Sequence, residues 1–281
     1  MDGPVLLSLG HGYAAAALAA SLPEGWRVVG TTRSAERAEA LRRSGVEAVL
    51  WDDAVEVERA IKAADAVLAS QPPGPDGDPA LTRCRGALVS ASAEWVGYLS
   101  TTGVYGDHEG GWVDEDTELD PVSARGAARV AAEEAWRATG LPLHVFRLPG
   151  IYGPGRSALD RLREGTARRI VKAGQVFSRI HVDDIGRALA ASIAKPAPGR
   201  AWNLADDEPA PPQDVIAFGA ELIGMPVPPD EPFETADLSP MARSFYGESK
   251  RVSNRRMRME LVDPLHADYR AGLRAILAGG G

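Results

Sequence analysis

The chain has 281 residues, a formal net charge of −8 and a single cysteine, Cys84. This length allows one large α/β domain or two smaller ones with a substantial buried core. The acidic balance disfavours a nucleic-acid partner, which would need an excess of lysine and arginine facing phosphates. One cysteine excludes an intrachain disulfide framework and fits a reducing compartment, and no apolar run approaches a membrane span. We therefore expect a cytoplasmic protein with no membrane partner.

Short apolar runs alternate with helical patterns along the first half of the chain. The expected strands are Val5–Leu9, Trp26–Gly30, Val46–Leu50, Ala66–Ser70 and Trp95–Ser100. The expected helices are Tyr13–Leu22, Ala35–Arg43, Ala54–Ala64 and Leu81–Ser92. Parallel strands need crossover connections, and such crossovers are right-handed. The alternation therefore predicts an α/β fold with a doubly wound parallel sheet.

The second half of the chain alternates less regularly. Further helices are expected over Ala124–Thr139, Ser157–Glu164 and Ile185–Ile193, and further strands over Leu143–Leu148 and Ala201–Ala205. Loops are expected at the proline- and glycine-rich segments Lys195–Arg200, Pro209–Pro212 and Met225–Pro232. We predict a nucleotide-binding core in residues 1–150 and a small substrate lobe in residues 151–281, with residues 183–206 returning to the core. Ligands of open α/β sheets bind at the carboxyl ends of the strands, which such a lobe would cover.

A glycine-rich turn follows the first expected strand. Its sequence, Gly10-His11-Gly12-Tyr13-Ala14-Ala15, matches the dinucleotide-binding pattern G-x-G-x-x-A. The first glycine allows a tight turn, the second lets the backbone approach a pyrophosphate, and the small Ala15 lets helix and strand pack closely. The N-terminus of the following helix supplies N–H groups and positive dipole for phosphate. This turn predicts cofactor binding, and the alternative is a purely structural turn.

The turn after the second expected strand indicates which cofactor is bound. NAD-binding sites carry an acidic residue there for the ribose hydroxyls, whereas an arginine accommodates the 2′-phosphate of NADP. This chain reads Gly30-Thr31-Thr32-Arg33-Ser34, with no acidic residue. Arg33 offers a permanently charged fork for phosphate, and Thr32 and Ser34 offer hydroxyl groups. NADP is therefore expected rather than NAD, the alternative being a surface arginine that opens a helix.

Two segments carry a resemblance to a known family. Ser100-Thr101-Thr102-Gly103-Val104-Tyr105-Gly106 and the segment Pro121 to Glu133 resemble the active-site stretch of extended short-chain dehydrogenase/reductases. From about residue 4 to residue 275 the chain is similar to the atypical, NAD-dependent epimerase/dehydratase-like branch of that family. The resemblance implies that Asp52 or Asp53 lies near the adenine and that Ser70 and Gln71 pass under the cofactor. It also implies that Thr101 orients a substrate carbonyl.

The same resemblance reveals two replaced residues. Where the family places its proton-transferring tyrosine and its lysine, this chain has Arg125 and Arg129. An arginine is a poor general acid because its pKa exceeds about 12, although Arg129 can still hold a ribose hydroxyl. Tyr105 or Tyr152 could supply the proton instead, or the arginines could bind an anionic substrate, or catalysis could be lost. The purely structural alternatives are a solvated helix face for the arginines and packing near the strand end for Tyr105.

Three later features complete the sequence analysis. His181 has no metal partner at useful spacing, so no metal site is expected, and we interpret it as structural or as a contact in the substrate lobe. Asp183 or Asp184 is expected to cap a helix. The basic run Lys250–Arg256 is interpreted as a solvated face or, alternatively, as a contact for an anion.

These features together predict an NADP(H)-binding oxidoreductase or epimerase-like protein. Its expected substrate is a small, polar carbonyl compound, sugar-derived or anionic, and its proton donor is non-standard. The alternative is a catalytically inactive NADP(H)-binding sensor. By analogy with extended dehydrogenases, we expect a homodimer that pairs through the helices after the fourth and fifth strands, where the alanine-rich surface of Ala124–Ala138 would permit close packing.

Overall fold

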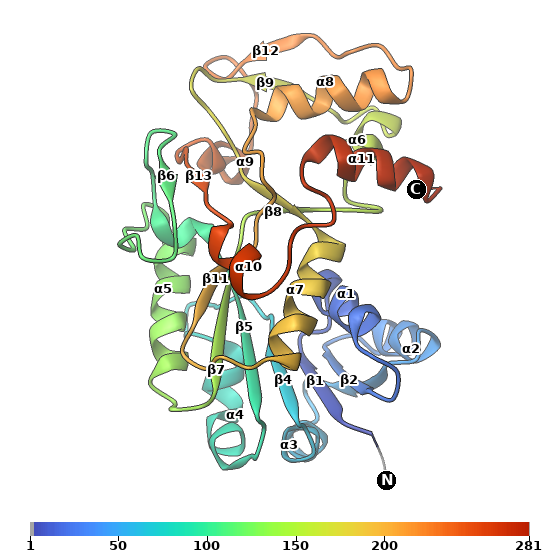
Figure 1. The fold of residues 1–281 in the computed structure, drawn as a ribbon, viewed down its shortest axis with the longest axis vertical. Helices are drawn as coiled ribbons and strands as arrows, with labels where there is room; N and C mark the ends of the chain where they lie inside the picture. Colours follow the sequence, from blue (N-terminus) through green and yellow to red (C-terminus); the bar gives the residue numbers. More distant parts are fainter. Residues whose placement is uncertain (1–2, 281) are drawn as a thin grey trace. The chain divides into compact units, whose positions relative to one another are not determined.

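The computed structural model describes residues 3–280 of the chain (Figure 1). The chain divides into two compact units. The first contains the chain as far as Thr101 together with Ala128–Arg147 and Ile185–Trp202, and the second contains Thr102–Ala127, Leu148–Asp184 and the chain from Asn203 onwards. The second unit therefore extends beyond the expected lobe, because it includes the segment that follows the fifth strand of the large sheet. As a statement about independently folding domains, the division at residue 150 stays a prediction.

The first unit is built on a seven-stranded sheet with the order β11-β7-β5-β4-β1-β2-β3. Its strands are β1 (Val5–Leu9), β2 (Arg27–Thr32), β3 (Glu47–Leu50), β4 (Ala66–Ala69), β5 (Trp95–Thr101), β7 (Leu143–Leu148) and β11 (Ala201–Asn203). The pairs β1–β2, β2–β3, β1–β4 and β4–β5 are all parallel. All seven strands were expected from the sequence, and the predicted doubly wound α/β sheet is confirmed.

The helices associated with this sheet also match the expected ranges within a few residues. They are α1 (Tyr13–Ser21), α2 (Ala35–Arg43), α3 (Ala54–Lys62), α4 (Pro79–Ser90), α5 (Ala124–Arg137) and α7 (Val182–Ala194). Side-chain oxygens define three of their starts, because Ser34, Asp53 and Asp78 each accept a hydrogen bond from the first turn of α2, α3 and α4. Such caps satisfy N–H groups that have no partner within the helix.

Alternating residues of β1 explain why helices cover both faces of the sheet. Val5, Leu7 and Leu9 belong to a core that also contains side chains of α3, α4 and α5. The intervening Leu6 is fully buried as well, so the opposite face of the strand is covered too. A Cβ atom built on Gly186 of α7 would lie 2.4 Å from the carbonyl oxygen of Ala17 in α1, which shows how closely these two helices pack.

The second unit combines short strands with small helices. Its elements include the 3₁₀ turn η1 (Thr102–Tyr105) and the parallel pairs β6 (Trp112–Val113) with β13 (Arg251–Val252), β8 (Gly150–Tyr152) with β10 (Arg179–His181), and β9 (Arg169–Val171) with β12 (Asp230–Pro232). The helices are α6 (Ala158–Arg163), α8 (Pro212–Leu222), α9 (Pro240–Phe245), α10 (Arg255–Glu260) and α11 (Tyr269–Ala278). Helices α6, α8 and α11 share an apolar core around Leu159, Ile216 and Leu273.

Several of these elements correct the sequence analysis. The strand β12 lies inside the segment Met225–Pro232, which was expected to be a loop, and α8 begins at Pro212, at the end of another expected loop.

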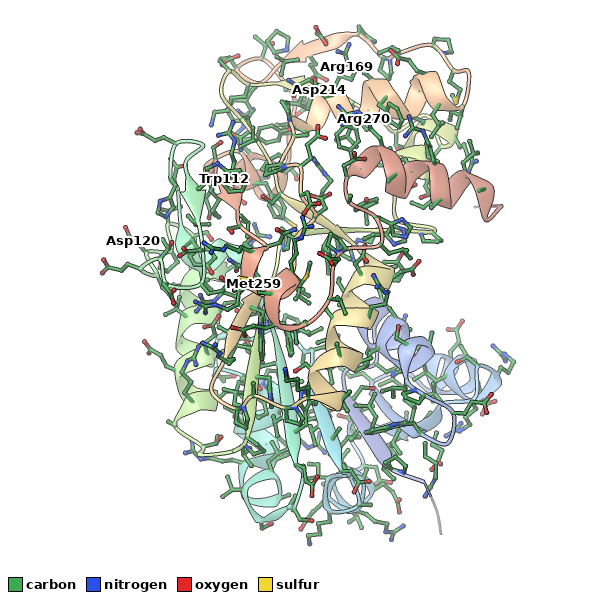
Figure 2. All side chains as sticks on the ribbon, viewed as in Figure 1. Trp112, Asp120, Arg169, Asp214, Met259 and Arg270 are labelled. Atoms are coloured by element: carbon green, nitrogen blue, oxygen red, sulfur yellow. The ribbon has the colours of Figure 1, made fainter. Side chains whose placement is uncertain are left out.

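Trp112 of β6 and Met259 of α10 carry side chains that are mostly exposed (Figure 2). Within residues 3–280, no helix combines the length and the apolar character that crossing a membrane requires.

Candidate functional site

The glycine-rich turn after β1 is held in place by β2 and β4. Gly10 has a φ angle of +87°, and a Cβ atom built on it would lie 2.7 Å from Cγ of Gln71. Its N–H group donates to Oγ1 of Thr31 at 2.8 Å, and the N–H of His11 donates to the Thr31 carbonyl at 3.0 Å. Only glycine fits at position 10 without backbone strain and a side-chain clash.

His11 is buried beneath this turn and takes part in holding it. Its Nδ1 atom lies 2.7 Å from the Ser8 hydroxyl, and its ring occupies the space that a Cβ atom at Gly30 would need. Burial lowers the pKa of His11, and the nearby Arg37 adds to the effect. We therefore assign His11 a structural role within the turn, because its side chain is taken up by contacts with β1 and β2.

Gly12 differs from Gly10 because no described part of the protein demands a glycine there. Its φ angle is −111°, which any residue can adopt, and the nearest atom to a built Cβ is the Gly10 carbonyl oxygen at 3.9 Å. Gly12 is the N-cap of α1, which has no acidic residue in its first turn. The space beside a helix N-terminus that lacks negative charge suits a phosphate group.

The residues expected to determine the preference between NADP and NAD lie at the end of β2. Thr32 is buried, whereas Arg33 and Ser34 are exposed. The Ser34 hydroxyl caps α2 by accepting from the N–H of Arg37 at 3.2 Å. Among the described residues, the guanidinium of Arg33 has no hydrogen-bond or ion-pair partner, whereas Arg27 and Arg42 nearby are paired with Glu47 and Glu39.

The turns after β3 and β4 contain the remaining residues implied for the cofactor. Asp53 caps α3, whereas the carboxylate of Asp52 lies 3.7 Å from a guanidinium nitrogen of Arg83. After β4, the Ser70 hydroxyl donates to the Gly10 carbonyl. The side-chain oxygen of Gln71 is buried and finds no hydrogen-bond partner within residues 3–280. An orphaned polar atom against the glycine-rich turn indicates a missing partner, which fits a bound ligand or water.

The strand β5 leads to the segment that resembles an active site. Thr101 is partly buried at the end of β5. Tyr105 of η1 is fully buried, and its hydroxyl donates to Oδ1 of Asn203 at 2.8 Å. The side chain of Tyr152 donates to the Asp268 carbonyl at 3.3 Å, and burial raises its pKa. Both tyrosine hydroxyls have partners within the second unit, so the structure favours packing roles over the hypothesis that either donates a proton to substrate.

The two arginines of α5 have separate partners. Nη1 of Arg129 donates to the Tyr98 hydroxyl at 3.0 Å and to the Leu99 carbonyl at 2.7 Å. Arg125 is exposed, donates to the Ser244 hydroxyl at 3.1 Å, and lies over the ring of Phe245. Burial raises the pKa of Tyr98 to about 12, which the Arg129 charge opposes. Arg129 therefore ties α5 to β5, whereas Arg125 keeps its charge at the surface of the second unit.

A buried ion pair beside these residues was not expected from the sequence. Glu133 of α5 accepts two hydrogen bonds from Arg147 of β7, at 3.1 and 2.8 Å, and one from the Ser100 hydroxyl at 2.6 Å. Glu133 and Arg147 are 1% and 3% exposed. The cluster joins β5, α5 and β7 at one place. An ion pair between residues 14 positions apart has no signal in hydrophobic periodicity, so only the fold reveals it.

Three features of the second unit differ from the expectations. Asp183 and Asp184 lie in the first turn of α7 rather than before it. Lys250, Arg251 and Arg256 of the basic run donate to Gly106, Gly110 and Asp116, so these three side chains do not form a solvated face, whereas Arg255 is exposed. His181 has a second histidine against it, with 4.0 Å between the ring centroids of His181 and His266. Spacing along the sequence missed this partner because it lies in a distant segment.

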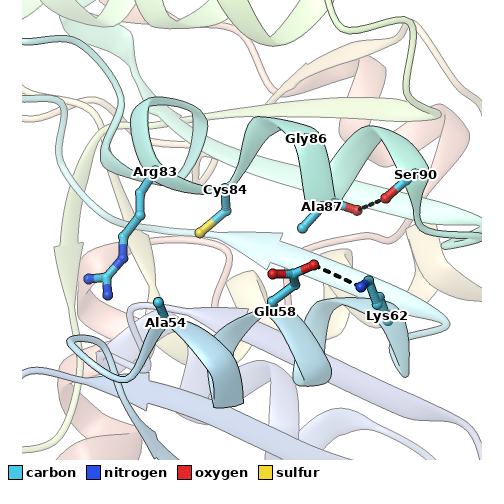
Figure 3. Close-up of a pocket in the computed structure, with 8 residues that line it drawn as sticks. All are labelled: Ala54, Glu58, Lys62, Arg83, Cys84, Gly86, Ala87 and Ser90. Atoms are coloured by element: carbon cyan, nitrogen blue, oxygen red, sulfur yellow. Dashed lines mark hydrogen bonds and ion pairs between the residues drawn. The ribbon is translucent and has the colours of Figure 1, made fainter.

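A separate hollow of about 450 Å³ lies between α3 and α4 (Figure 3). It is lined by Ala54, Glu58, Lys62, Arg83, Cys84, Gly86, Ala87 and Ser90. Glu58 and Lys62 pair with each other at 2.7 Å. Burial raises the pKa of the Cys84 thiol, which makes it a poor nucleophile. Arg83 is paired with Asp52 outside the hollow, so each of these charged groups has a partner, and we assign the hollow no role.

Comparison with known proteins agrees with this description. Residues 84–205 match the family model of the NAD dependent epimerase/dehydratase family. A conserved protein of unknown function from Silicibacter pomeroyi, with a solved structure, is 52% identical over 98% of this chain and 99% of that chain, with a TM-score of 0.93. Protein YeeZ of Escherichia coli K12 is 29% identical over 239 residues, which are 78% of this chain and 84% of YeeZ.

A more distant structure shares the fold. The UDP-glucuronic acid 4-epimerase of Bacillus cereus, solved in complex with NAD, is 18% identical, with a TM-score of 0.76 and coverage of 96% of both chains. The family model over residues 84–205 and this shared fold agree with the resemblance found in the sequence. Across residues 84–205 the chain thus matches the NAD dependent epimerase/dehydratase family, and it shares the fold of solved epimerase structures.

Proposed function

We propose that the first unit binds NADP(H) and prefers it to NAD(H). The pyrophosphate would lie against Gly10, Gly12 and Tyr13 at the start of α1, with Ala15 allowing that helix to approach β1. Ser70 and Gln71 would pass under the cofactor, and the orphaned oxygen of Gln71 would gain a partner. Asp52 would lie near the adenine. The open space beside Gly12 supports this arrangement, because a ligand can approach the Gly12 backbone where no protein atom blocks it.

The observation that carries the preference for NADP is the unpartnered guanidinium of Arg33. Arg33 directly follows β2, where proteins of this fold contact the adenosine ribose. No described residue neutralises the Arg33 charge. Thr32 and Ser34 flank it with hydroxyl groups. A 2′-phosphate would complete this set with charge-assisted hydrogen bonds, each worth about 1.5–3 kcal/mol. NAD has no such group and would leave Arg33 without a partner.

Calorimetric titration with NADPH and NADH tests the preference. We expect Arg33→Asp to weaken NADPH binding by about ten- to one-hundred-fold while leaving NADH binding unchanged or improved. Arg43→Asp is the matched control, because it makes the same charge change in an exposed residue at the far end of α2. Equal affinity of the wild-type protein for both cofactors, or equal effects of both substitutions, would refute the role of Arg33.

We further propose that the protein is an oxidoreductase or epimerase-like enzyme for a small polar carbonyl compound. A bound nicotinamide supplies hydride transfer. Thr101 would orient the carbonyl, and Arg129, fixed to β5 by two hydrogen bonds, would hold the ribose. Arg125 would bind an anionic group of the substrate. The name of the B. cereus relative, UDP-glucuronic acid 4-epimerase, supports a sugar-derived, anionic substrate class. The proton donor would lie outside Arg125 and Arg129.

A sensor that binds NADP(H) without turnover is the second candidate. The observation in its favour is that Tyr105 and Tyr152 are both buried with their hydroxyls engaged. A panel of aldehydes, ketones and nucleotide sugars, followed by loss of NADPH absorbance, separates the two. Turnover supports the enzyme, and Arg125→Ala should then raise KM more than it lowers kcat. Tight NADPH binding with no turnover across the panel supports the sensor.

We also propose a homodimer that pairs through α4 and α5. The half-exposed Val89 on α4, the alanine-rich sequence of α5 and the analogy with extended dehydrogenases support this pairing. Sedimentation at micromolar protein concentration tests the assembly, with Val89→Lys as the variant that should dissociate it. A wild-type protein that sediments as a monomer would exclude this proposal.

A further inference from the structure

The second unit contains a cluster of two histidines and one aspartate that the proposed cofactor chemistry does not use. His181 ends β10, Asp183 lies in the first turn of α7, and His266 lies in the loop before α11. One potential ligand atom from each residue lies within 4.8 Å of the others. Oδ2 of Asp183 is 3.5 Å from Nδ1 of His181 and 3.7 Å from Nε2 of His266.

The fold brings these residues together through Asp184. Its two carboxylate oxygens accept from the N–H groups of Leu265 and His266, at 2.5 and 3.1 Å. This bond pair fixes the loop before α11 against the start of α7. His266 is thereby held beside His181, although 85 positions separate the two in the sequence. The two hydrogen bonds of Asp184 therefore hold the cluster together.

The histidines also have unsatisfied nitrogen atoms. Nε2 of His181 and Nε2 of His266 are both buried and have no hydrogen-bond partner among the described residues. Nδ1 of His181 accepts the Asp183 N–H in a long bond of 3.2 Å. A buried polar atom without a partner costs about 1–3 kcal/mol, and Nε2 of His266, 3.7 Å from Oδ2 of Asp183, is the orphaned atom that a ligand at this cluster would satisfy.

We propose that His181, Asp183 and His266 form a binding site for a divalent metal ion of the zinc class. Two imidazole nitrogens and one carboxylate oxygen suit Zn²⁺ better than Mg²⁺ or Ca²⁺, which prefer oxygen ligands. Around tetrahedral zinc, bond lengths of about 2.0–2.1 Å separate the ligand atoms by about 3.3 Å. The two distances from the Asp183 oxygen, 3.5 and 3.7 Å, need shifts of only a few tenths of an ångström, and each ligand atom lies within 4.8 Å of the other two.

The site would be open to solvent on one side. The side chain of Asp183 is 56% exposed, whereas those of His181 and His266 are 2% and 10% exposed. An ion could therefore enter past the aspartate, and a water molecule could take the fourth position that three protein ligands leave. In accepting the ion, Nδ1 of His181 would exchange its long bond to the Asp183 N–H for a metal bond. The ion would join β10, α7 and the loop before α11.

Metal uptake by the untagged, full-length protein tests the proposal. The chain is stripped with a chelator and then titrated with Zn²⁺ in competition with a chromophoric chelator, and with Co²⁺ followed by its visible absorption. We expect one equivalent per chain, a tetrahedral Co²⁺ spectrum, and a higher unfolding temperature with Zn²⁺. His266→Ala and Asp183→Asn should each weaken uptake at least about tenfold. His108→Ala removes a histidine of the same unit outside the cluster and should change nothing.

Two results would overturn the site. One is the absence of stoichiometric uptake by the wild-type protein, which would mean that the orphaned nitrogens hold only water. The other is uptake that His266→Ala and Asp183→Asn leave unaltered. Asp183→Asn keeps the shape of an exposed side chain, so it remains informative even if His266→Ala disturbs the fold. Circular dichroism and retained NADPH binding establish that each variant is folded.

Discussion

Gly10 and Gly12 are glycines for different physical reasons. Gly10 needs its positive φ and has Gln71 against it, whereas Gly12 has an ordinary φ and open space. Gly12→Ser should leave stability unchanged, because serine is a favoured N-cap, while NADPH affinity falls at least about tenfold as a side chain enters the phosphate space. Gly10→Ser should instead lower the free energy of unfolding by about 1–3 kcal/mol.

Thermal unfolding and NADPH titration of the two serine variants separate these effects.

The two glycines also show how much of the site could be predicted from the sequence. The pattern of the turn predicted both glycines, but it could not predict that Tyr105 is fully buried or that His266 faces His181. Burial and contact between distant segments depend on the packing of the whole fold, which a local motif does not contain.

Asp206 is the residue whose ionisation should affect stability most clearly. It is 1% exposed, and burial raises its pKa to about 8 from 3.8, although Arg179 and the Glu208 N–H oppose the rise. The unfolded chain ionises it near pH 3.8, so between about pH 4 and pH 8 the folded state keeps a proton that the unfolded state has lost. Stability should fall as pH rises through this window, by up to about 1.4 kcal/mol per pH unit from this group.

Urea unfolding at a series of pH values measures this contribution. Asp206→Asn cannot ionise and should lose stability less steeply than the wild-type protein between about pH 4 and pH 8. The difference between the two should stop growing above the folded pKa of about 8. Asp237→Asn alters an exposed carboxylate and should run parallel to the wild-type protein. Parallel curves for Asp206→Asn as well would show that Asp206 ionises normally in the folded protein.

At the scale of elements, the Glu133 cluster explains how α5 is attached to the sheet. Glu133→Ala would leave the buried guanidinium of Arg147 without its carboxylate and should cost about 3–5 kcal/mol of unfolding free energy. The matched substitution Glu47→Ala breaks an exposed pair with Arg27 and should cost about 1 kcal/mol or less. Chemical denaturation measures both. Similar costs for the two variants would mean that the buried pair adds no more than a surface pair.

The elements that could be predicted are those whose burial leaves a pattern. Parallel strands covered on both faces read as continuous apolar runs, and β1, β4 and β7 are buried along their whole length. The strands of the second unit have two or three residues, too few to show a period. Moreover, β6 pairs with β13 across more than a hundred positions. Their existence depends on tertiary contacts that periodicity cannot report.

At the scale of the whole molecule, the two units are interleaved along the chain. The last segment of the first unit is Ile185–Trp202. It supplies most of α7 and of the edge strand β11. Ser192 of α7 accepts from the Trp95 indole at 3.0 Å, and Trp202 stacks on Phe146 with 5.4 Å between centroids. A chain cut at residue 150 loses these partners, leaves an edge of the sheet bare and uncovers large aromatic side chains.

A fragment of residues 1–150 should therefore aggregate or lack a cooperative unfolding transition, although the glycine-rich turn and Arg33 are present in it. A fragment of residues 1–206 restores α7 and β11 and should unfold cooperatively and bind NADPH. Thermal denaturation and NADPH titration of both fragments provide the measurement. Because NADPH stabilises only a folded site, it should raise the transition of the longer fragment alone. If the 1–150 fragment folds and binds NADPH equally well, the boundary at residue 150 marks an independent domain and the interleaved segments are dispensable to it.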